Sequence, residues 1–316
     1  MRLFPSKSRL KRIGIGLGII VGVLFIVNGI FALWTERQWQ NRLAAIRAVG
    51  EPASIADLKP APIPDDQNAA AILKKIDPTI KRLERAFSKF SDSEVGKNYE
   101  ETYDSGEEPT AEQIEAVKDI LKSYSEVTTA VDAAVAANQY ASQLDYSLDF
   151  ERFNEELLES APKIRAIARY YDWKMRTLVA EGRNEEAVLT GLQLLRLTRL
   201  YESEPTLVNQ LITIACRGIA VDGIDRALRG GSITPETRRA LDKELAFHDD
   251  PQAAVRSLKT ERAFSITSME HMTHHVHPVL TRLLGWPIKR YYIGVLDFYD
   301  VQLGLAAEPW YKVGYG

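Results

Sequence analysis

The run IGIGLGIIVGVLFIVNGIFAL, from Ile13 to Leu33, contains 21 residues and no charged side chain. At roughly 1.5 Å per residue it would be about 31 Å long as a helix, which matches the hydrocarbon core of a bilayer. Asn28 is its only strongly polar side chain, and a helix satisfies its backbone polar groups internally. We therefore predict that residues 13–33 form a transmembrane helix and that the lipid bilayer is a partner of this chain.

The charges on either side of this run predict its orientation. Five basic residues and no acidic residue come before it, whereas the sequence after it is mixed, with Glu36, Arg37 and Arg42. The five are Arg2, Lys7, Arg9, Lys11 and Arg12. By the positive-inside rule, residues 1–12 form a cytoplasmic tail. The 283 residues after Leu33 then lie outside the cytoplasm, which is the periplasmic side in a bacterium.

A cleaved secretory signal is the alternative interpretation of the same run. Signal peptides have apolar regions of about 7 to 15 residues that end at a site of small residues. Here the apolar run is longer and ends in Phe31-Ala32-Leu33-Trp34. The sequence therefore favours an uncleaved signal-anchor.

A stripe of glycines within the run suggests self-association. Gly14, Gly18 and Gly22 recur every four residues, and Asn28 lies at the edge of the same stripe. Small residues at this spacing let two membrane helices approach closely, and an asparagine can hydrogen-bond across such a pair. The pattern predicts a homodimer through the transmembrane helix. The alternative is that glycine is simply common in membrane helices.

Composition indicates a folded protein that does not bind nucleic acid. Hydrophobic residues make up 45% of the chain, which is enough for a core. Without the five basic residues before the span, 35 basic residues remain against 43 acidic ones, and phosphate binding needs a basic surface.

Cys216 is the sole cysteine, so no disulfide can form within the chain. Its apolar neighbours indicate a buried side chain rather than a nucleophile.

A juxtamembrane helix and a proline-rich strap are expected over residues 34–65. Trp39, Leu43 and Ile46 recur at helical spacing, and Gly50 is placed to end that helix. Four prolines then occur within 13 residues, namely Pro52, Pro60, Pro62 and Pro64. Proline interrupts helices and favours an extended chain.

The remaining residues, 66–316, predict an all-α domain of about eight packed helices, arranged as a bundle or an irregular array of α-hairpins. The signal is strongest from 155 to 230, where three helical patterns are separated near Gly182 and Pro205. Short connections of this kind make neighbouring helices antiparallel.

Weaker patterns fill the stretch before these helices. Asp66 is expected to cap a first short helix, and Thr110 a long helix that continues to Ala137. Residues 91–109 are polar and acidic, and predict an exposed loop. Residues 138–153 mix aromatic and acidic side chains, and predict a loop that packs its aromatic residues on the helices.

The strap carries the motifs of a resemblance. Gly50-Glu51-Pro52, Ala56-Asp57-Leu58, Pro62-Ile63-Pro64 and Asn68-Ala69-Ala70 follow directly on a single span, with an echo at Glu261-Arg262-Ala263. Together they resemble a signature of bacterial single-pass, membrane-anchored, all-helical proteins whose function is unassigned. The resemblance implies an extracytoplasmic domain and supplies no catalytic residue.

A second, shorter resemblance concerns one helical turn. The run LVAEGRNEEA, residues 178–187, resembles the hairpin turn of tetratricopeptide-type repeats. The chain has no second copy at the expected spacing of about 34 residues.

A histidine cluster is the only pattern that suggests a metal. His271, His274, His275 and His277 fall within seven residues. On a helix, residues four apart share a face, and imidazole is a good ligand for zinc, nickel and copper. A divalent metal is thus the one cofactor that the sequence suggests. The alternative is a polar helix end before Pro278, with solvated imidazoles and imidazoles that bind terminal carbonyls.

The last 31 residues, 286–316, contain eight aromatic side chains. They predict either a core-packed last helix or a face that binds a partner or the membrane surface.

No motif in the sequence specifies a reaction. The favoured hypothesis is a membrane-anchored, non-enzymatic binding or scaffold module with a protein partner still to be found. The alternatives are a metal-binding protein or metal-dependent enzyme built on the histidine cluster, and a dimeric envelope-organising protein.

Overall fold

The chain is all-α, as predicted, with helices α1 to α12 and one short 3-10 helix, η1. The computed structural model describes residues 7–204, 206–248, 250, 252–275 and 278–308, and these contain no strand. The chain divides into two compact units. Unit 1 combines the chain up to Asp57 with Glu261–Leu305, and unit 2 consists chiefly of Leu58–Thr260.

Unit 1 contains the expected span within α1 (Lys7–Ala48), a single helix of 42 residues. This helix is long and apolar enough to cross a membrane, which is consistent with a single-pass anchor. Its apolar side chains between Ile15 and Leu33 are exposed, Leu24 for example to 61%. Such exposure suits a helix surrounded by lipid. Gly50, with φ of +72°, follows the end of the helix in the left-handed conformation that glycine adopts readily.

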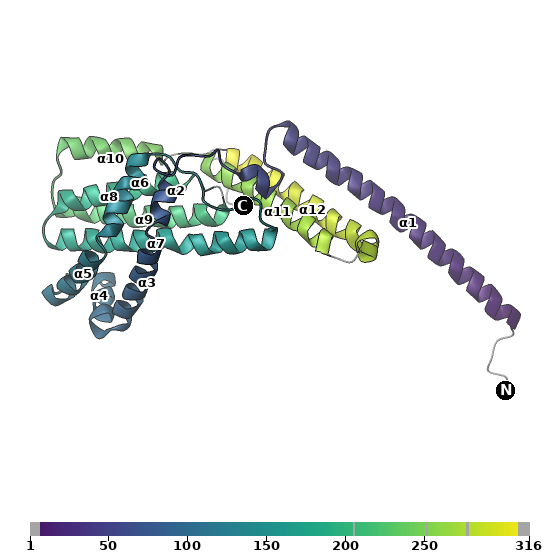
Figure 1. Cartoon of the computed structure of the whole chain (residues 1–316), viewed down its shortest axis with the longest axis horizontal. Helices are drawn as coiled ribbons and strands as arrows, with labels where there is room; N and C mark the ends of the chain where they lie inside the picture. Colours follow the sequence, from purple (N-terminus) through teal and green to yellow (C-terminus); the bar gives the residue numbers. More distant parts are fainter. Residues whose placement is uncertain (1–6, 205, 249, 251, 276–277, 309–316) are drawn as a thin grey trace. The chain divides into compact units, whose positions relative to one another are not determined.

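The rest of unit 1 packs on the second half of α1. The elements are η1 (Ile55–Leu58), α11 (Gln252–His275, in unit 1 from Glu261 onward) and α12 (Pro278–Ala307). α11 and α12 lie side by side (Figure 1), and the Ser265 and Tyr299 hydroxyls are 3.1 Å apart. One core joins the three long helices, formed by Trp39, Leu43, Ile46, Ala53, Ile266, Met269, Ile293 and Leu296.

The strap is bound to α11 rather than free. Glu51 forms an ion pair with Arg262, whose side chain is only 4% exposed. The amide of Ile55 donates to Thr267 Oγ1 at 3.0 Å. Two motifs of the resemblance, Gly-Glu-Pro and Glu-Arg-Ala, are therefore brought together by a nearly buried charge pair.

The aromatic last helix has two different faces. Ile293 and Leu296 are 5% and 2% exposed and belong to the core of unit 1. Tyr291 and Phe298 are 69% and 57% exposed. Within the described residues, α12 is therefore both a core element and the carrier of an exposed apolar face, and residues 309–316 lie outside the described range.

Unit 2 is centred on three long helices that pack side by side, α7, α8 and α9 (Figure 1). α10 packs on α8, and α3 and α5 pack on α7. The helices of unit 2 are α2 (Ala69–Lys74), α3 (Asp77–Asp92), α4 (Glu94–Asp104), α5 (Ala111–Ser123), α6 (Glu126–Ala137), α7 (Phe150–Ala180), α8 (Asn184–Tyr201), α9 (Leu207–Gly230) and α10 (Pro235–Phe247). The three helices predicted between 155 and 230 are confirmed. Gly182 supplies the left-handed turn between α7 and α8, with φ of +74°.

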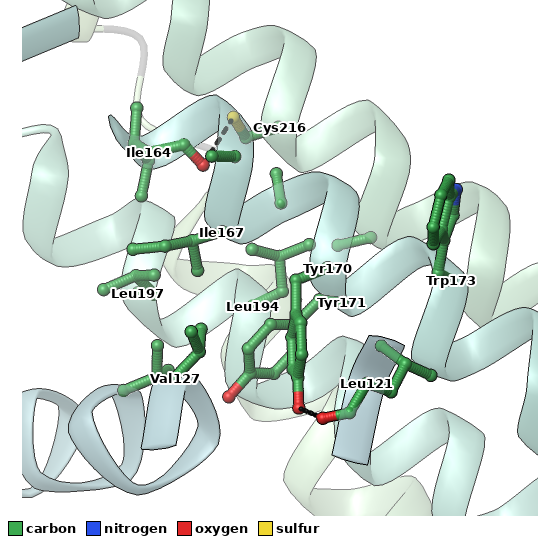
Figure 2. Packing of buried hydrophobic residues seen from close by; sticks show 14 of the residues in the cluster. Leu121, Val127, Ile164, Ile167, Tyr170, Tyr171, Trp173, Leu194, Leu197 and Cys216 are labelled. Atoms are coloured by element: carbon green, nitrogen blue, oxygen red, sulfur yellow. Dashed lines mark hydrogen bonds between the residues drawn. The ribbon is translucent and has the colours of Figure 1, made fainter. Parts of the chain in front are cut away.

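The core of unit 2 is rich in aromatic residues from α7 (Figure 2). Trp173 meets Phe87 and Phe90 of α3 edge-on, with ring centroids 4.5 and 5.0 Å apart. Cys216 is 1% exposed, and its Sγ lies 3.9 Å from the carbonyl oxygen of Ile164. Burial raises the pKa of this thiol to about 12, so Cys216 is the inert, buried side chain that its neighbours predicted.

Glycine permits the close approach of α8 to its neighbours. A Cβ atom at Gly191 would lie 2.5 Å from Cγ1 of Ile224 on α9 and 3.0 Å from Sδ of Met175 on α7. At Gly218, which lies on α9, a Cβ atom would meet nothing within 4 Å. Only the first of these two glycines is required by packing.

Helix α9 is a second helix long and apolar enough to cross a membrane. A third of its most apolar stretch is buried, and it packs against both α7 and α8. These contacts make α9 a central helix of unit 2. Its outward face still exposes apolar side chains, with Leu211 at 59% and Ile214 at 51%.

Three local predictions were wrong. Residues 91–109 are not all loop, because Ser93 caps α4 and buried Tyr99 fixes that helix on Phe90. The helix expected from Thr110 to Ala137 is two helices, since the chain breaks at Tyr124 and Ser125. The first short helix is capped by Asn68 and not by Asp66. These breaks give more helices than the eight expected, whereas the capping box at Thr110 and Gln113 is confirmed.

Candidate functional site

Unit 2 contains a cavity of about 290 Å³ between its first helices and α7. Its walls come from α2, α3, α7, the segment 138–149 and the end of α8. The lining residues are Ala70, Leu73, Lys74, Asp77, Ile80, Lys81, Tyr140, Ser142, Gln143, Leu144, Glu156, Glu159, Lys163, Ile164, Ile167, Tyr201 and Glu204. Apolar pockets of this size with a few polar groups are typical of small-molecule sites.

Asn68 holds one wall of the cavity in place. Its Oδ1 accepts from the amides of Ala70 and Ala141, both at 3.0 Å, and its Nδ2 donates to the Ala141 carbonyl at 2.9 Å. The amide of Ala69 donates to the Gln139 carbonyl at 2.9 Å. Asn68 is 1% exposed. This side chain thus caps α2 and also fixes the backbone on which Tyr140 stands.

Glu204 is the buried acid of the cavity. It is 6% exposed, and Tyr140 donates its hydroxyl to Oε1 at 3.1 Å. Its other oxygen, Oε2, is buried and accepts no hydrogen bond of ordinary geometry from the described residues. Burial raises the pKa of Glu204, and the Ser142 and Tyr140 hydroxyls partly oppose that rise. Besides these two hydroxyls, the carboxyl group has no hydrogen-bond donor or cation among the described residues, and its Oε2 accepts no hydrogen bond of ordinary geometry.

Two tyrosine rings stand beside this acid. Tyr140 and Tyr201 meet nearly perpendicularly, at 86°, with ring centroids 5.9 Å apart. The Tyr201 hydroxyl donates to Oδ1 of Asn209 at 3.1 Å, which fixes its ring. Burial raises the pKa of Tyr140 well above its usual value, so its hydroxyl stays protonated and remains a donor to Glu204.

The opposite wall carries an ion pair. Nζ of Lys163 on α7 lies 2.5 Å from Oδ2 of Asp77 on α3. The other oxygen of Asp77, Oδ1, is buried and has no hydrogen-bond partner among the described residues. Lys74, Lys81 and Glu159 add charges of both signs to the lining. The cavity therefore has an apolar body, one buried acid and a lining of mixed charge.

This arrangement is suited to binding. A buried carboxyl with a free oxygen can receive a cationic or proton-donating group, because an unpaired polar atom in an apolar site is costly. The apolar walls at Leu73, Ile80 and Ile167 can cover an aliphatic or aromatic body.

Comparisons with protein-family models, with curated proteins and with solved structures find no match for this chain. The cavity is therefore interpreted from its own residues.

The histidines predicted as metal ligands lie largely outside the described part of unit 1. His271 is on α11 and half-buried. The side chains of His274 and His275 and the whole of His277 are outside the described residues. The part of the chain that the structure describes holds no group of three or more histidine, cysteine or acidic side chains able to bind a metal. The metal hypothesis therefore stays a prediction.

The glycine stripe of the span is exposed and makes no close contact within the described structure, whereas Asn28 accepts a hydrogen bond from its own chain. Gly14, Gly18 and Gly22 are exposed, and a Cβ atom at any of them would meet nothing within 4 Å. Oδ1 of Asn28 accepts a hydrogen bond of 2.7 Å from Nε1 of Trp286. Asn28 thus has a partner within its own chain, and the homodimer remains a prediction that rests on the glycines.

Sequence reasoning missed the cavity. Tyr140 lies in the segment 138–153, which was predicted to be a loop. Glu204 lies in the connection between α8 and α9, which was interpreted only as a turn between helices. The one available signal was the aromatic content of residues 138–153, which is unusual for a solvated loop. Nothing in the sequence paired that segment with Glu204, because the two are joined only through the fold.

Proposed function

We propose that this chain is a membrane-anchored binding module that acts without catalysis and takes a small ligand in the cavity of unit 2. The observation that carries the proposal is Glu204. Its Oε2 is buried in the cavity and accepts no hydrogen bond of ordinary geometry from the described residues. A ligand group placed there would relieve the cost of that unpaired atom.

The chemistry of the cavity favours a ligand with a cationic head and an apolar body. A primary ammonium group can donate to Oε2 of Glu204 and lie near the rings of Tyr140 and Tyr201, which attract cations. The body would lie along Ile80 and Ile167. A carboxylate head would be repelled by Glu204, whereas a hydroxyl head would gain one hydrogen bond without the ionic attraction.

We place unit 2 outside the cytoplasm, with the N-terminus inside. The five basic residues ahead of the span support this orientation. The resemblance of the strap motifs to bacterial anchored proteins supports a periplasmic location. A reporter enzyme that folds only outside the cytoplasm, fused after residue 65, should be active. An inactive reporter in an intact fusion would contradict the orientation.

The ligand proposal is tested by thermal denaturation of the full-length protein in detergent with hexylamine, hexanol and hexanoate as probes. A ligand that binds only the folded state at 100 times its Kd stabilises by about 2.7 kcal/mol. We expect the melting temperature to rise most with hexylamine, and this rise to be lost in Glu204→Gln. Glu159→Gln is the matched control, because Glu159 is an exposed acid of the same lining.

Two results would contradict this proposal. One is the absence of a shift with all three probes, and the other is an equal shift in wild type and Glu204→Gln. A larger shift with hexanoate than with hexylamine would also contradict it, because the lysines of the lining would then provide recognition.

A further inference from the structure

Two acids that line the cavity of unit 2 have one property in common. Among the described residues, the carboxylate oxygens that are buried and accept no hydrogen bond of ordinary geometry are Oε2 of Glu204 and Oδ1 of Asp77. Glu204 lies in the connection between α8 and α9, and Asp77 is the first residue of α3. Both residues line the same cavity. Buried polar atoms without a partner are rare in folded proteins, so this coincidence indicates a ligand with a polar group at each end.

The two acids differ in their charge partners. Oδ2 of Asp77 lies 2.5 Å from Nζ of Lys163, whereas Glu204 has two hydroxyl groups beside it and no cation among the described residues. Because Lys163 already balances the charge of Asp77, the second oxygen of Asp77 needs a hydrogen-bond donor rather than another cation. An ammonium group placed there would lie close to the ammonium group of Lys163 and be repelled by it.

The charges of the whole lining agree with this division. Its acidic residues are Asp77, Glu156, Glu159 and Glu204, and its basic residues are Lys74, Lys81 and Lys163. When all are ionised, four negative charges oppose three positive ones. One ammonium group therefore balances the lining, and two would leave an excess of positive charge. Apolar side chains complete the walls, among them Ile164 and Ile167 of α7 (Figure 2), and they can cover an alkyl chain.

We propose, on the basis of the function proposed above, that the ligand of unit 2 is an amino alcohol. Its ammonium group binds Oε2 of Glu204, and a hydroxyl group at the other end of an alkyl chain donates to Oδ1 of Asp77. The terminal torsion of a carboxyl group is broad, so each acid can turn its unpaired oxygen toward the ligand. The hydroxyl group satisfies a buried oxygen that a simple alkylamine leaves unpaired.

The test compares each amino alcohol with the alkylamine of the same length. Aminobutanol, aminopentanol and aminohexanol, with their two groups at opposite ends, and butylamine, pentylamine and hexylamine are titrated by calorimetry into the full-length protein in detergent. The series finds the length that reaches from Glu204 to Asp77. At that length we expect the amino alcohol to bind about five-fold more tightly, which is the gain of one net hydrogen bond.

Two further ligands identify the chemistry of the second group. The methyl ether of the best amino alcohol can accept a hydrogen bond but cannot donate one, so it should bind no more tightly than the alkylamine. Diaminohexane should also show no gain over hexylamine, because its second ammonium group would lie beside Lys163. A diamine that binds more tightly than both the amino alcohol and the alkylamine would overturn the proposal.

A double variant identifies the atom that receives the hydroxyl group. Asp77→Leu combined with Lys163→Met replaces the ion pair by apolar side chains and leaves no unpaired charge, a change that folded proteins commonly tolerate. In this variant the amino alcohol should bind more weakly than the alkylamine, because its hydroxyl group is buried without a partner. Glu159→Gln, at an exposed acid of the same lining, is the control and should keep the five-fold preference.

The outcomes separate this proposal from the function on which it rests. Equal affinities of amino alcohol and alkylamine at every length, with hexylamine still dependent on Glu204, would overturn the amino alcohol and leave the binding of amines intact. A preference that persists in the double variant would overturn it too, because the hydroxyl group would then bind elsewhere. If no amine binds at all, the proposed function itself is contradicted.

Discussion

Replacing Gly191 with alanine should destabilise the protein, although alanine favours helices. In a helix interior, glycine-to-alanine gains about 1 kcal/mol from backbone entropy. At Gly191, however, the new Cβ would lie 2.5 Å from Cγ1 of Ile224, a buried and β-branched side chain. Moving this atom forces Ile224 from its preferred rotamer, and overpacking of this kind costs about 1 to 3 kcal/mol. We expect a net loss of about 1 kcal/mol.

Gly218→Ala is the matched control for this experiment. It makes the same chemical change inside a long helix, but its Cβ would meet nothing within 4 Å. We expect a gain of about 1 kcal/mol there. The two variants should then differ by about 2 kcal/mol, or about 4 to 8 °C in melting temperature for a unit of roughly 200 residues. Thermal unfolding followed by circular dichroism measures this difference. Equal stabilisation by both variants would refute the packing of α8 on α9.

Three further predictions concern the ion pair of the strap, the acid of the cavity and one helix cap. Glu51→Ala should lower the free energy of unfolding by up to about 3 kcal/mol in urea titration, because it leaves the nearly buried charge of Arg262 with only the more distant carboxylate of Asp300, at 3.9 Å; an unchanged midpoint would contradict the pairing. Glu204 has a raised pKa in the folded state, so its ionisation destabilises the fold as pH rises above 4.5, its unfolded value. Glu204→Gln should therefore be more stable than wild type at pH 8, but not at pH 3.5, and a stability difference that does not change between these pH values would be the opposing result. Thr110→Ala should cost about 1 kcal/mol, because it removes the capping box with Gln113; no loss in melting temperature would show that this helix end contributes nothing.

The elements that the sequence predicted well are those encoded by neighbouring residues. The span is a continuous apolar run, and α7 and α8 combine long helical periodicity with a glycine turn at Gly182. The capping box at Thr110 also lies within one turn of helix. Signals of this kind are readable without the fold, since every interacting partner is within four residues.

The elements that it predicted poorly depend on distant partners. α4 is a helix because Tyr99 packs on Phe90, although its composition is that of a solvated loop. The cavity joins Tyr140 to Glu204 across 64 positions, and Asn68 to Ala141 across 73. None of these residue types indicates a site by itself, and no local spacing connects them.

The hydrogen bond between Asn28 and Trp286 also imposes an order of events during synthesis. Its partners are 258 residues apart, and at about 5 to 20 residues per second the ribosome needs roughly 10 to 50 s to make the chain between them. Throughout this interval, α1 as the membrane span that its sequence predicts would hold the amide of Asn28 without its eventual partner. Such an anchor would be most open to other membrane helices just after insertion, before Trp286 of α12 is made and occupies Asn28.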